Sequence, residues 1–181
     1  MKEAPALLIC MGVSGCGKST VATSLADQFD LEFIEADEFH SDANRAHMAA
    51  GNALDESMRR PWIDSICDAL GDHLQGNRNC VLACSGLRRA HRQRFRELGF
   101  RAQFIHLCGD KELMAARMTQ RRDHFMPTEL LDSQYSDLEA TDDEADIVSL
   151  DIKADLPQVL SQAAAMTRIF LQSKPAGCSS E

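Results

Sequence analysis

A glycine-rich octapeptide near the start of the chain constrains the fold more than any other feature. Its sequence, Gly12-Val13-Ser14-Gly15-Cys16-Gly17-Lys18-Ser19, matches the phosphate-binding pattern G-x-x-x-x-G-K-S/T at every fixed position. An apolar run typical of a buried strand precedes it at 6–11, and apolar residues recur at helical spacing in 19–29. Strand, glycine loop and helix in this order surround a polyphosphate with backbone N–H groups and a helix N-terminus. A glycine-rich turn with an incidental lysine is the alternative, but it leaves the flanking elements unexplained. The chain is therefore predicted to bind a nucleotide.

Individual residues of this loop have distinct expected roles. The amine of Lys18 is expected to reach the β- and γ-phosphates, and the hydroxyl of Ser19 is expected to ligate Mg²⁺. The residues predicted to contact the nucleotide are Gly12, Ser14, Gly15, Cys16, Gly17, Lys18, Ser19, Thr20 and, from a later helix, Arg117.

Length and composition limit the class of protein. At 181 residues the chain is expected to form one domain over 1–172, followed by a disordered tail at 173–181. The net charge of −9 argues against general binding to nucleic acid or anionic membranes, which requires clustered lysine and arginine. No apolar stretch approaches membrane-spanning length, and residues 1–5 lack the apolar core of a signal peptide. Seven cysteines, mostly in apolar strands, favour reduced thiols and a cytoplasmic location over disulfides or zinc.

Apolar runs and amphipathic segments alternate along the chain. Strands are predicted at 6–11, 32–36, 80–84, 103–108 and 146–150, and helices near 18–29, 42–50, 57–75, 88–98, 110–121, 128–138 and 156–172. This order predicts an α/β fold of three layers, in which helices cover both faces of a five-stranded parallel sheet. Ligands bind such sheets at the carboxyl ends of the strands, so the loops at 12–18, 35–45, 84–92 and 151–155 are expected to carry the chemistry. The last of these loops is the candidate for adenine contacts.

Two carboxylates follow the second predicted strand. Glu35 and Asp37 alternate onto one side of the extended chain. One carboxylate beside a transferred phosphoryl group can orient or deprotonate an attacking hydroxyl, and another can hold Mg²⁺ through water. We assign the first role to Asp37 and the second to Glu35, with a solvated acidic loop as the alternative. His40 is expected either to bind substrate or to cap the next helix.

Arginines concentrate after the third and fourth strands. Ser85 is expected to cap a helix that begins near Arg88, and Arg88, Arg89 and Arg92 are candidates to clamp a carboxylate or phosphate. A basic, solvated helix is the alternative. Arg117 and Arg121, four residues apart, share a helix face and are expected to belong to a lid that brings arginine onto the phosphates. Simple complements to the helix dipole are the other interpretation of these two residues.

Several segments together resemble the gluconate kinases (gluconokinases), P-loop kinases related to shikimate kinase and adenylate kinase. The resemblance covers about 6–155 and is most specific in the two stretches that contain Arg59-Arg60-Pro61-Trp62 and His124-Phe125-Met126-Pro127. The other matching residues are Met11 to Ser19, Asp37 with His40, Asn44, Met48, Gly51, Leu54, Ala83 to Arg89, Leu130-Leu131, Ser133-Gln134 and Leu138-Glu139.

The resemblance implies ATP-dependent phosphorylation of D-gluconate at its 6-hydroxyl by a homodimer. It also implies a lid at 117–127 and a helical substrate-binding region at 40–62. With this resemblance, Asp37, Lys18 and Arg121 are expected to be catalytic. The residues expected to bind the sugar acid are Asp37, His40, Arg59, Arg88, Arg92 and His124, with Arg59 and Arg88 as the main candidates for its carboxylate.

The chain also departs from the family pattern. Where the family usually has Asp-x-Asp, this chain has Glu35-Ala36-Asp37. The usual Leu-Asn-Asp-x-Asp-Arg corresponds to the segment from Leu54 to Arg59, with departures at Asp55 and Met58. The usual Ser-Ala-Leu-Lys corresponds to the segment from Ser85 to Arg88, with Gly86 in place of alanine. These changes bear on substrate identity more than on reaction type, so a kinase for another aldonate, polyol or shikimate-like acid is the alternative. A nucleotide-binding regulator without activity is a further one, which the combination of Lys18, Asp37 and the lid arginines disfavours.

Overall fold

A five-stranded, all-parallel sheet organises the chain in the computed structural model, which describes residues 3–119 and 130–173. The strands are β1 (Ala6–Met11), β2 (Glu32–Glu35), β3 (Cys80–Ala83), β4 (Arg101–Cys108) and β5 (Ile147–Asp151), and their order is β2-β3-β1-β4-β5. β1 lies at the centre, where it pairs with β3 and β4, and all six of its residues are buried. The predicted five-stranded parallel sheet is confirmed.

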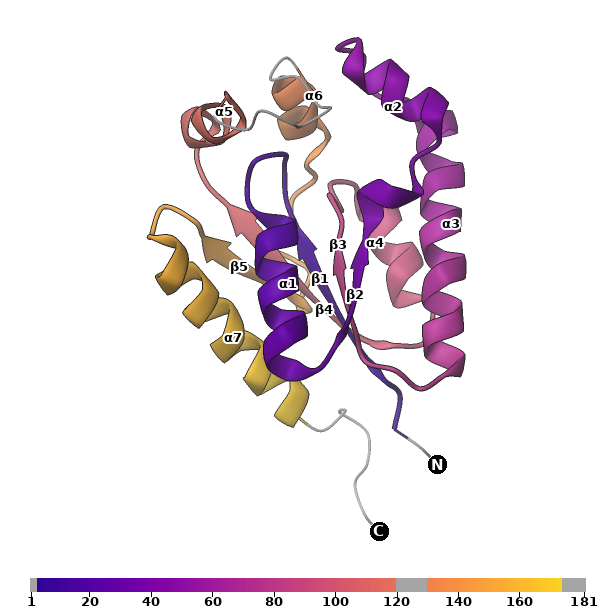
Figure 1. The fold of residues 1–181 in the computed structure, drawn as a ribbon, viewed down its shortest axis with the longest axis vertical. Coiled ribbons are helices and arrows are strands. Elements are labelled where there is room, and N and C mark those ends of the chain that lie inside the picture. Colours follow the sequence, from indigo (N-terminus) through magenta and orange to yellow (C-terminus); the bar gives the residue numbers. More distant parts are fainter. Residues whose placement is uncertain (1–2, 120–129, 174–181) are drawn as a thin grey trace.

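Helices cover both faces of this sheet (Figure 1). Alternate residues of β1 enter opposite cores, because successive side chains of a strand point to opposite faces. Leu8 packs in the core formed with α1 (Lys18–Phe29) and α7 (Leu156–Gln172). Ile9 packs in the core formed with α3 (Glu56–Gln75) and α4 (Arg89–Arg96). The result is the three-layer α/β/α arrangement expected from the sequence.

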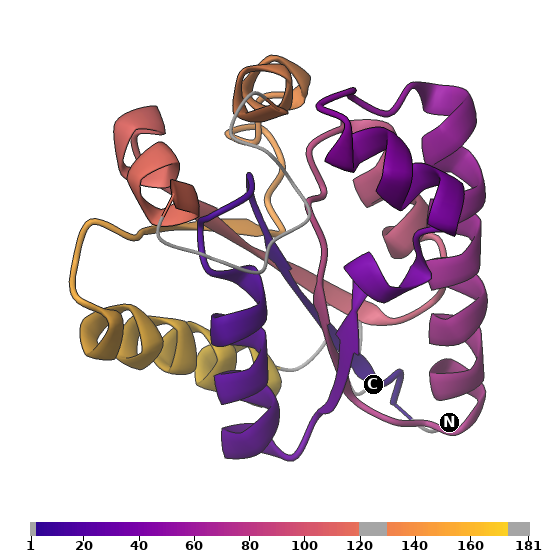
Figure 2. The ribbon, with the colours of Figure 1, turned by 45° about the horizontal axis from the view of Figure 1, so that its top comes forward.

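The remaining helices lie beyond the carboxyl ends of the strands. They are the 3₁₀ helix η1 (Ala36–Phe39), α2 (Asp42–Ala49), α5 (Lys111–Thr119) and α6 (Leu130–Asp137). In Figure 2, α5 and α6 stand on one side of the loop that follows β1, while α2 and the start of α3 stand on the other. Since open α/β sheets bind ligands at this edge, the helices are placed to form the walls of a site.

Helix boundaries follow local hydrogen bonds, and some differ from the prediction. Asp55 begins α3 by accepting a hydrogen bond from the N–H of Met58, a normal N-cap. Ser85 does not cap α4, whose N-cap is Arg88 without a side-chain bond, because the carboxylate of Glu139 accepts from the Arg89 N–H instead. β4 begins at Arg101, where its N–H donates to the carbonyl of Pro5. Within the described ranges, no helix combines the length and the apolarity that crossing a membrane requires.

Candidate active site

The glycine loop between β1 and α1 has the geometry of an anion-binding cradle. Gly12, Gly15 and Gly17 all have positive φ angles, of 140°, 85° and 96°. Gly12 also lies so close to β4 that a Cβ atom there would stand 2.7 Å from the carbonyl oxygen of Leu107. Gly17 is the N-cap of α1 and makes no side-chain cap bond, which leaves N–H groups at the start of the helix available to a ligand. The amine of Lys18 donates to the carbonyl of Val13 across the loop, at 3.1 Å.

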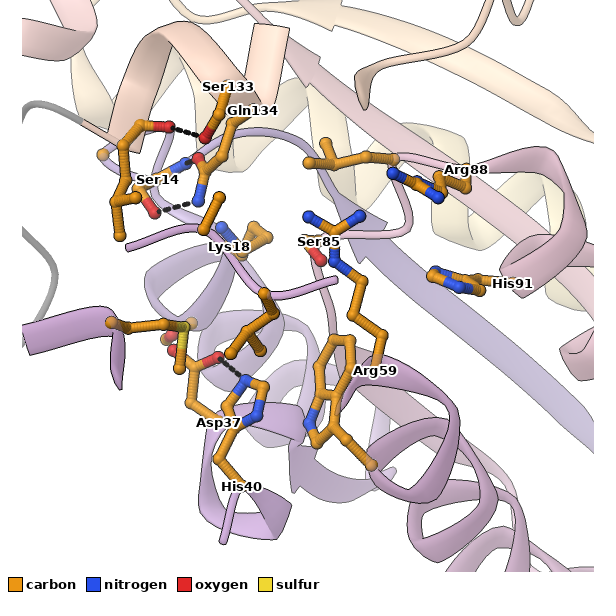
Figure 3. A pocket seen from close by; sticks show the side chains of 18 of the residues that line it. Ser14, Lys18, Asp37, His40, Arg59, Ser85, Arg88, His91, Ser133 and Gln134 are labelled. Carbon is orange, nitrogen blue, oxygen red and sulfur yellow. Dashed lines mark hydrogen bonds and ion pairs between the residues drawn. The ribbon is translucent and has the colours of Figure 1, made fainter. Parts of the chain in front are cut away.

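A single main pocket joins this loop to the helices above the sheet (Figure 3). Its walls come from the glycine loop, η1, α2, α3, the segment before α4, and α6. The residues predicted to act on phosphate, acceptor and sugar acid that line it are Lys18, Ser19, Asp37, His40, Arg59 and Arg88. The fold therefore brings together, in one cavity, residues as far apart in the sequence as Ser14 and Gln134, which are 120 positions apart.

Asp37 and His40 lie together on one side of the main pocket. Nε2 of His40 lies 4.0 Å from Oδ1 of Asp37, and the imidazole stacks on Trp62 with ring centroids 4.4 Å apart. Trp62 is fixed in turn, because its indole N–H donates to the carbonyl of Ala36 at 2.7 Å. Burial lowers the pKa of His40, and the nearby Asp37 only partly opposes this, so the imidazole is neutral near pH 7. Its Nδ1 is buried and has no hydrogen-bond partner among the described residues.

Glu35 lies beneath this side of the pocket, next to the glycine loop. Its carboxylate accepts hydrogen bonds from the Ser19 hydroxyl and, at 3.5 Å, from the N–H of Asp37. Burial raises the pKa of Glu35 and the charge of Asp37 adds to the rise, while the bond from Ser19 opposes it. In the parts of the chain that the structure describes, no three His, Cys, Asp or Glu side chains cluster as a metal site. A hydroxyl and a carboxylate together are nevertheless the kind of sparse oxygen set with which proteins hold Mg²⁺ on a phosphate.

The opposite wall of the main pocket is basic. Arg59 extends from α3 toward the side that carries Arg88 and His91 (Figure 3). Asp137, at the end of α6, accepts from both arginines, at 2.5 Å from Arg59 and 2.7 Å from Arg88. Glu56 accepts from Arg88 at 3.0 Å and lies 3.0 Å from Nε2 of His91. We call Arg59, Arg88, Glu56 and Asp137 the pocket network.

A second pocket lies on the other side of the glycine loop. Thr20 and the loop backbone form one part of its wall, and Ile152, Leu156 and Val159 supply apolar side chains. Arg117 also lines it, and its guanidinium donates to the carbonyl of Ile152 at 2.9 Å. The second pocket thus lies next to the glycine loop and at the carboxyl end of β5. This is the position of the loop at 151–155, which the sequence indicated as one of the loops that carry the chemistry.

Comparison with known proteins identifies the family. A family model described as an AAA domain matches residues 7–141. The probable gluconokinase of Rattus norvegicus is 36% identical over 175 residues, which cover 87% of this chain and 95% of that protein. The chain belongs to the gluconokinase family. The resemblance inferred from the sequence is confirmed.

Solved structures agree with this assignment. A gluconokinase from Sinorhizobium meliloti 1021 is 32% identical and has a TM-score of 0.78, covering 96% of this chain and 100% of that chain. An unliganded sugar kinase from Janibacter sp. HTCC2649 is 37% identical and has a TM-score of 0.84, covering 91% of this chain and 95% of that chain.

Against this gluconokinase-family fold, one predicted substrate residue needs correction. Arg92 is not among the described residues that line the main pocket, and its side chain is fully buried against Glu144. Its guanidinium binds both oxygens of Glu144 and donates to the carbonyls of Gly86 and Leu87. Arg89 is likewise absent from this lining and pairs with Asp143. Of residues 88, 89 and 92, only Arg88 lines the pocket.

Other predictions fall at the edge of what the structure describes. Arg121 and His124, and most of the proposed lid at 117–127, lie outside the described residues. Arg117 is described, and it lines the second pocket and not the main one.

Two side chains of α6, Gln134 and Asp137, contact site residues although no role was predicted for them from the sequence. Ser14 of the glycine loop donates its N–H to Oε1 of Gln134 at 2.7 Å, and Nε2 of Gln134 donates to the Ser14 hydroxyl at 3.0 Å. Gln134 was part of the family resemblance, so a signal for it existed. Asp137 carried no such signal, and only the spacing of three residues from Gln134, which places both on one helix face, could have suggested it.

Proposed function

We propose that the chain transfers the γ-phosphoryl group of ATP to the 6-hydroxyl of D-gluconate, forming 6-phospho-D-gluconate and ADP. One observation carries this proposal: a single cavity is lined by a phosphate-binding lysine, a carboxylate and a pair of arginines, namely Lys18, Asp37, Arg59 and Arg88. A sugar acid needs these three kinds of contact at its reacting end and at its carboxylate. The names of the relatives support gluconate as the acid.

In this proposal catalysis consists of positioning and charge stabilisation. Lys18 leaves Val13 to neutralise charge on the β- and γ-phosphates. Asp37 accepts a hydrogen bond from the 6-hydroxyl and receives its proton as the bond to phosphorus forms. Neutral His40, stacked on Trp62, lies beside Asp37 and helps to orient it. Arg121 adds positive charge at the phosphates, and His124 contacts the sugar acid.

Mg²⁺ belongs to the proposal as well. Ser19 would ligate the ion directly and Glu35 would hold it through water, while phosphate oxygens and further water complete the shell. The hydrogen bond between Ser19 and Glu35 supports this pairing, since it keeps the two oxygen groups adjacent. When bound, the ion supplies charge neutralisation between the β- and γ-phosphates.

The second pocket is proposed to receive the adenosine part of ATP. Its apolar side chains, Ile152, Leu156 and Val159, suit a base, and it lies directly beside the glycine loop. Arg117 and Thr20 line the same pocket, between the base and the phosphates.

Two family departures lie outside the described cavity lining and so give no support to another acid. Met58 packs in a small apolar cluster with Met48, Leu54 and Leu130 and is not among the described lining residues of the main pocket. Asp55 is the N-cap of α3. Both residues thus have structural roles, and neither changes the chemistry of the cavity wall.

Assembly and location remain proposals that rest on the family resemblance. We propose one kinase domain over 1–172, a homodimer, and a cytoplasmic enzyme. Sedimentation velocity at micromolar concentration tests the dimer, for which a single species of twice the chain mass is expected.

The decisive experiment measures ADP release with a panel of acceptors: gluconate, other aldonates, polyols, shikimate and AMP. We expect release with gluconate above all others. Release with another acid alone would replace gluconate in the assignment, and release with none would remove the kinase activity.

Two variants accompany the panel. Lys18→Ala should abolish most activity while circular dichroism stays that of the parent, because Lys18 is only partly buried and its amine bonds a loop carbonyl, that of Val13. Asp37→Asn keeps size and hydrogen bonding but removes the basic oxygen, so kcat should fall by roughly 10²–10⁴-fold with little change in ATP binding. Turnover equal to the parent in Asp37→Asn would exclude a catalytic Asp37.

A further inference from the structure

Asp137 connects the two arginines of the main pocket. Its Oδ2 accepts from Arg59 at 2.5 Å and its Oδ1 accepts from Arg88 at 2.7 Å. The arginines come from separate elements, α3 and the residue that precedes α4, while Asp137 ends α6. One carboxylate therefore joins three segments, with its two oxygens divided between two cations. Charge-assisted bonds of this type are among the strongest that side chains form.

The position of Asp137 relative to the main pocket determines which N–H groups of the two arginines a ligand can reach. Arg59 and Arg88 line the cavity, but Asp137 is not among its described lining residues. The carboxylate thus holds both guanidinium groups without itself lining the ligand space. Arg59 has no other hydrogen-bond partner within residues 3–119 and 130–173, so most of its N–H groups are available to a ligand. Arg88 is also held by Glu56, through its other terminal nitrogen.

Charge explains why such a residue is needed. Two guanidinium groups that bind one substrate carboxylate must lie close together, and like charges repel each other. Both are also partly withdrawn from water, with side-chain exposures of 14% for Arg59 and 34% for Arg88. Burial raises the pKa of Asp137, but the hydrogen bonds from Arg88 and Arg59 outweigh it and hold the pKa below its usual range. Asp137 is therefore negatively charged at neutral pH.

We propose that Asp137 is a positioning residue of the acid-binding site, which holds Arg59 and Arg88 side by side with their remaining N–H groups toward the cavity. This inference rests on the proposed function and names a residue that acts through the two arginines. The arginines are oriented before the acid arrives, so less binding free energy is lost to ordering them.

The opposite arrangement would make Asp137 a competitor. In that case the carboxylate would occupy the place of the substrate acid and would have to leave when the acid binds. Its position outside the cavity lining favours positioning, and the two arrangements predict opposite changes in KM.

The test compares Asp137→Asn, Asp137→Glu and the parent by steady-state kinetics and thermal unfolding. Asparagine has the same size but only one acceptor oxygen, so one of the two arginines loses its partner. We expect KM for gluconate to rise by about tenfold, equivalent to ~1.4 kcal/mol. KM for ATP and kcat at saturating gluconate should stay within about twofold of the parent. Asp137→Glu, which keeps both oxygens on a longer stem, should recover part of the loss.

Asp143→Asn is the matched control, because Asp143 pairs with the neighbouring Arg89 outside the cavity. It should leave both KM values unchanged. An Asp137→Asn enzyme with unchanged KM for gluconate overturns the inference, and so does one with a lower KM, which would identify a competitor. An equal loss of affinity for ATP and gluconate would also overturn it, since it would indicate general distortion.

The parent enzyme separates this inference from the proposed function. If the parent phosphorylates another carboxylic acid and not gluconate, the proposed function fails, and the same comparison is made with that acid. If the parent uses gluconate but the variants keep its KM, the inference fails alone.

Discussion

Two arginine–carboxylate networks lie side by side in this molecule, and they differ in how many N–H groups of their arginines are bound by other residues of the described chain. The pocket network contains Arg59, Arg88, Glu56 and Asp137. The second, which we call the inner network, contains Arg92, Arg96, Glu144 and Asp146. Each contains at least one arginine from the 88–96 segment that binds a carboxylate from residues 137–146. Sequence and residue type alone do not distinguish them.

The inner network is saturated by the protein. Arg92 is fully buried, and each of its three guanidinium nitrogens donates to Glu144 or to a backbone carbonyl. Arg96 binds both Glu144 and Asp146 and also lies over the ring of Phe104, with its Cζ 4.8 Å from the ring centroid. No N–H group of Arg92 is left for a ligand, so this arginine stabilises the fold.

In the pocket network, Arg59 keeps N–H groups that no described residue binds. Arg59 has a single partner in the described part of the chain, and that partner contacts it from outside the cavity. We infer that the number of N–H groups already bound by the protein separates Arg92, which stabilises the fold, from Arg59, which is proposed to bind the ligand. Three perturbations of the two networks and one of the exposed ion pair beside them, ordered by the size of the expected effect, can break or sharpen this distinction.

Removing Arg92 should have the largest effect. Arg92→Ala removes the main hydrogen-bond partner of Glu144, whose side chain is only 7% exposed. Breaking a buried ion pair in this way typically costs about 3–5 kcal/mol. Urea unfolding should show this loss in the free energy of unfolding, while the folded enzyme keeps its KM for gluconate. A variant of parental stability with a raised KM would return Arg92 to the substrate site and break the comparison.

Removing Arg59 should produce the opposite pattern. Arg59→Ala deletes a cavity-lining cation, and a hydrogen bond to a charged group contributes about 1.5–3 kcal/mol. KM for gluconate should therefore rise by about 10–150-fold, with KM for ATP nearly unchanged. The free energy of unfolding should change much less than in Arg92→Ala, because Asp137 keeps Arg88 as a partner. A large loss of stability without a change in KM would contradict the assignment.

The same contrast explains how much could be predicted from the sequence. Hydrophobic periodicity and the glycine loop predicted the sheet, the helix order and the edge that carries the pocket, since these depend on local pattern and on general rules of parallel sheets. Asp37, Arg59 and Arg88 were also found, because they follow strands or belong to the family resemblance. Arg92 was assigned wrongly, because sequence spacing gives no information on whether distant carboxylates saturate an arginine. Asp137 and Glu144 act through partners about 50 to 80 positions away, and no local pattern marks such pairs.

Lowering the pH should reduce the contribution of the inner network to the free energy of unfolding, by less than Arg92→Ala does. Burial raises the pKa of Glu144, but hydrogen bonds from Arg92 and Arg96 outweigh it and bring the pKa below the ordinary value of 4.5. A carboxylate whose pKa is lowered by folding contributes stability that is present above pH 4.5 and is lost as the pH falls through the lowered value.

Glu144→Gln tests this contribution. The free energy of unfolding of the parent should exceed that of Glu144→Gln at pH 7, and the difference should narrow below pH 4.5. A difference that stays constant as the pH falls would show that the charge of Glu144 does not stabilise the fold. Comparing the two proteins at each pH cancels the titration of other groups, including the buried His106 near Arg92.

The smallest effect is expected at the exposed pair of Arg89 and Asp143. These two side chains make the same kind of bond as the networks beside them, yet 48% of Arg89 and 64% of Asp143 are exposed. Water and salt screen such a pair, and ordering two long side chains offsets what attraction remains. Asp143→Asn should therefore leave the urea midpoint and both KM values at the parental level, at low and at high salt. A loss of stability comparable to that of Arg92→Ala would mean that burial is not what separates the networks. Since Arg89 and Arg92 lie on the same helix and within one turn of each other, the two ion pairs differ in burial while the arginine and its helix stay constant.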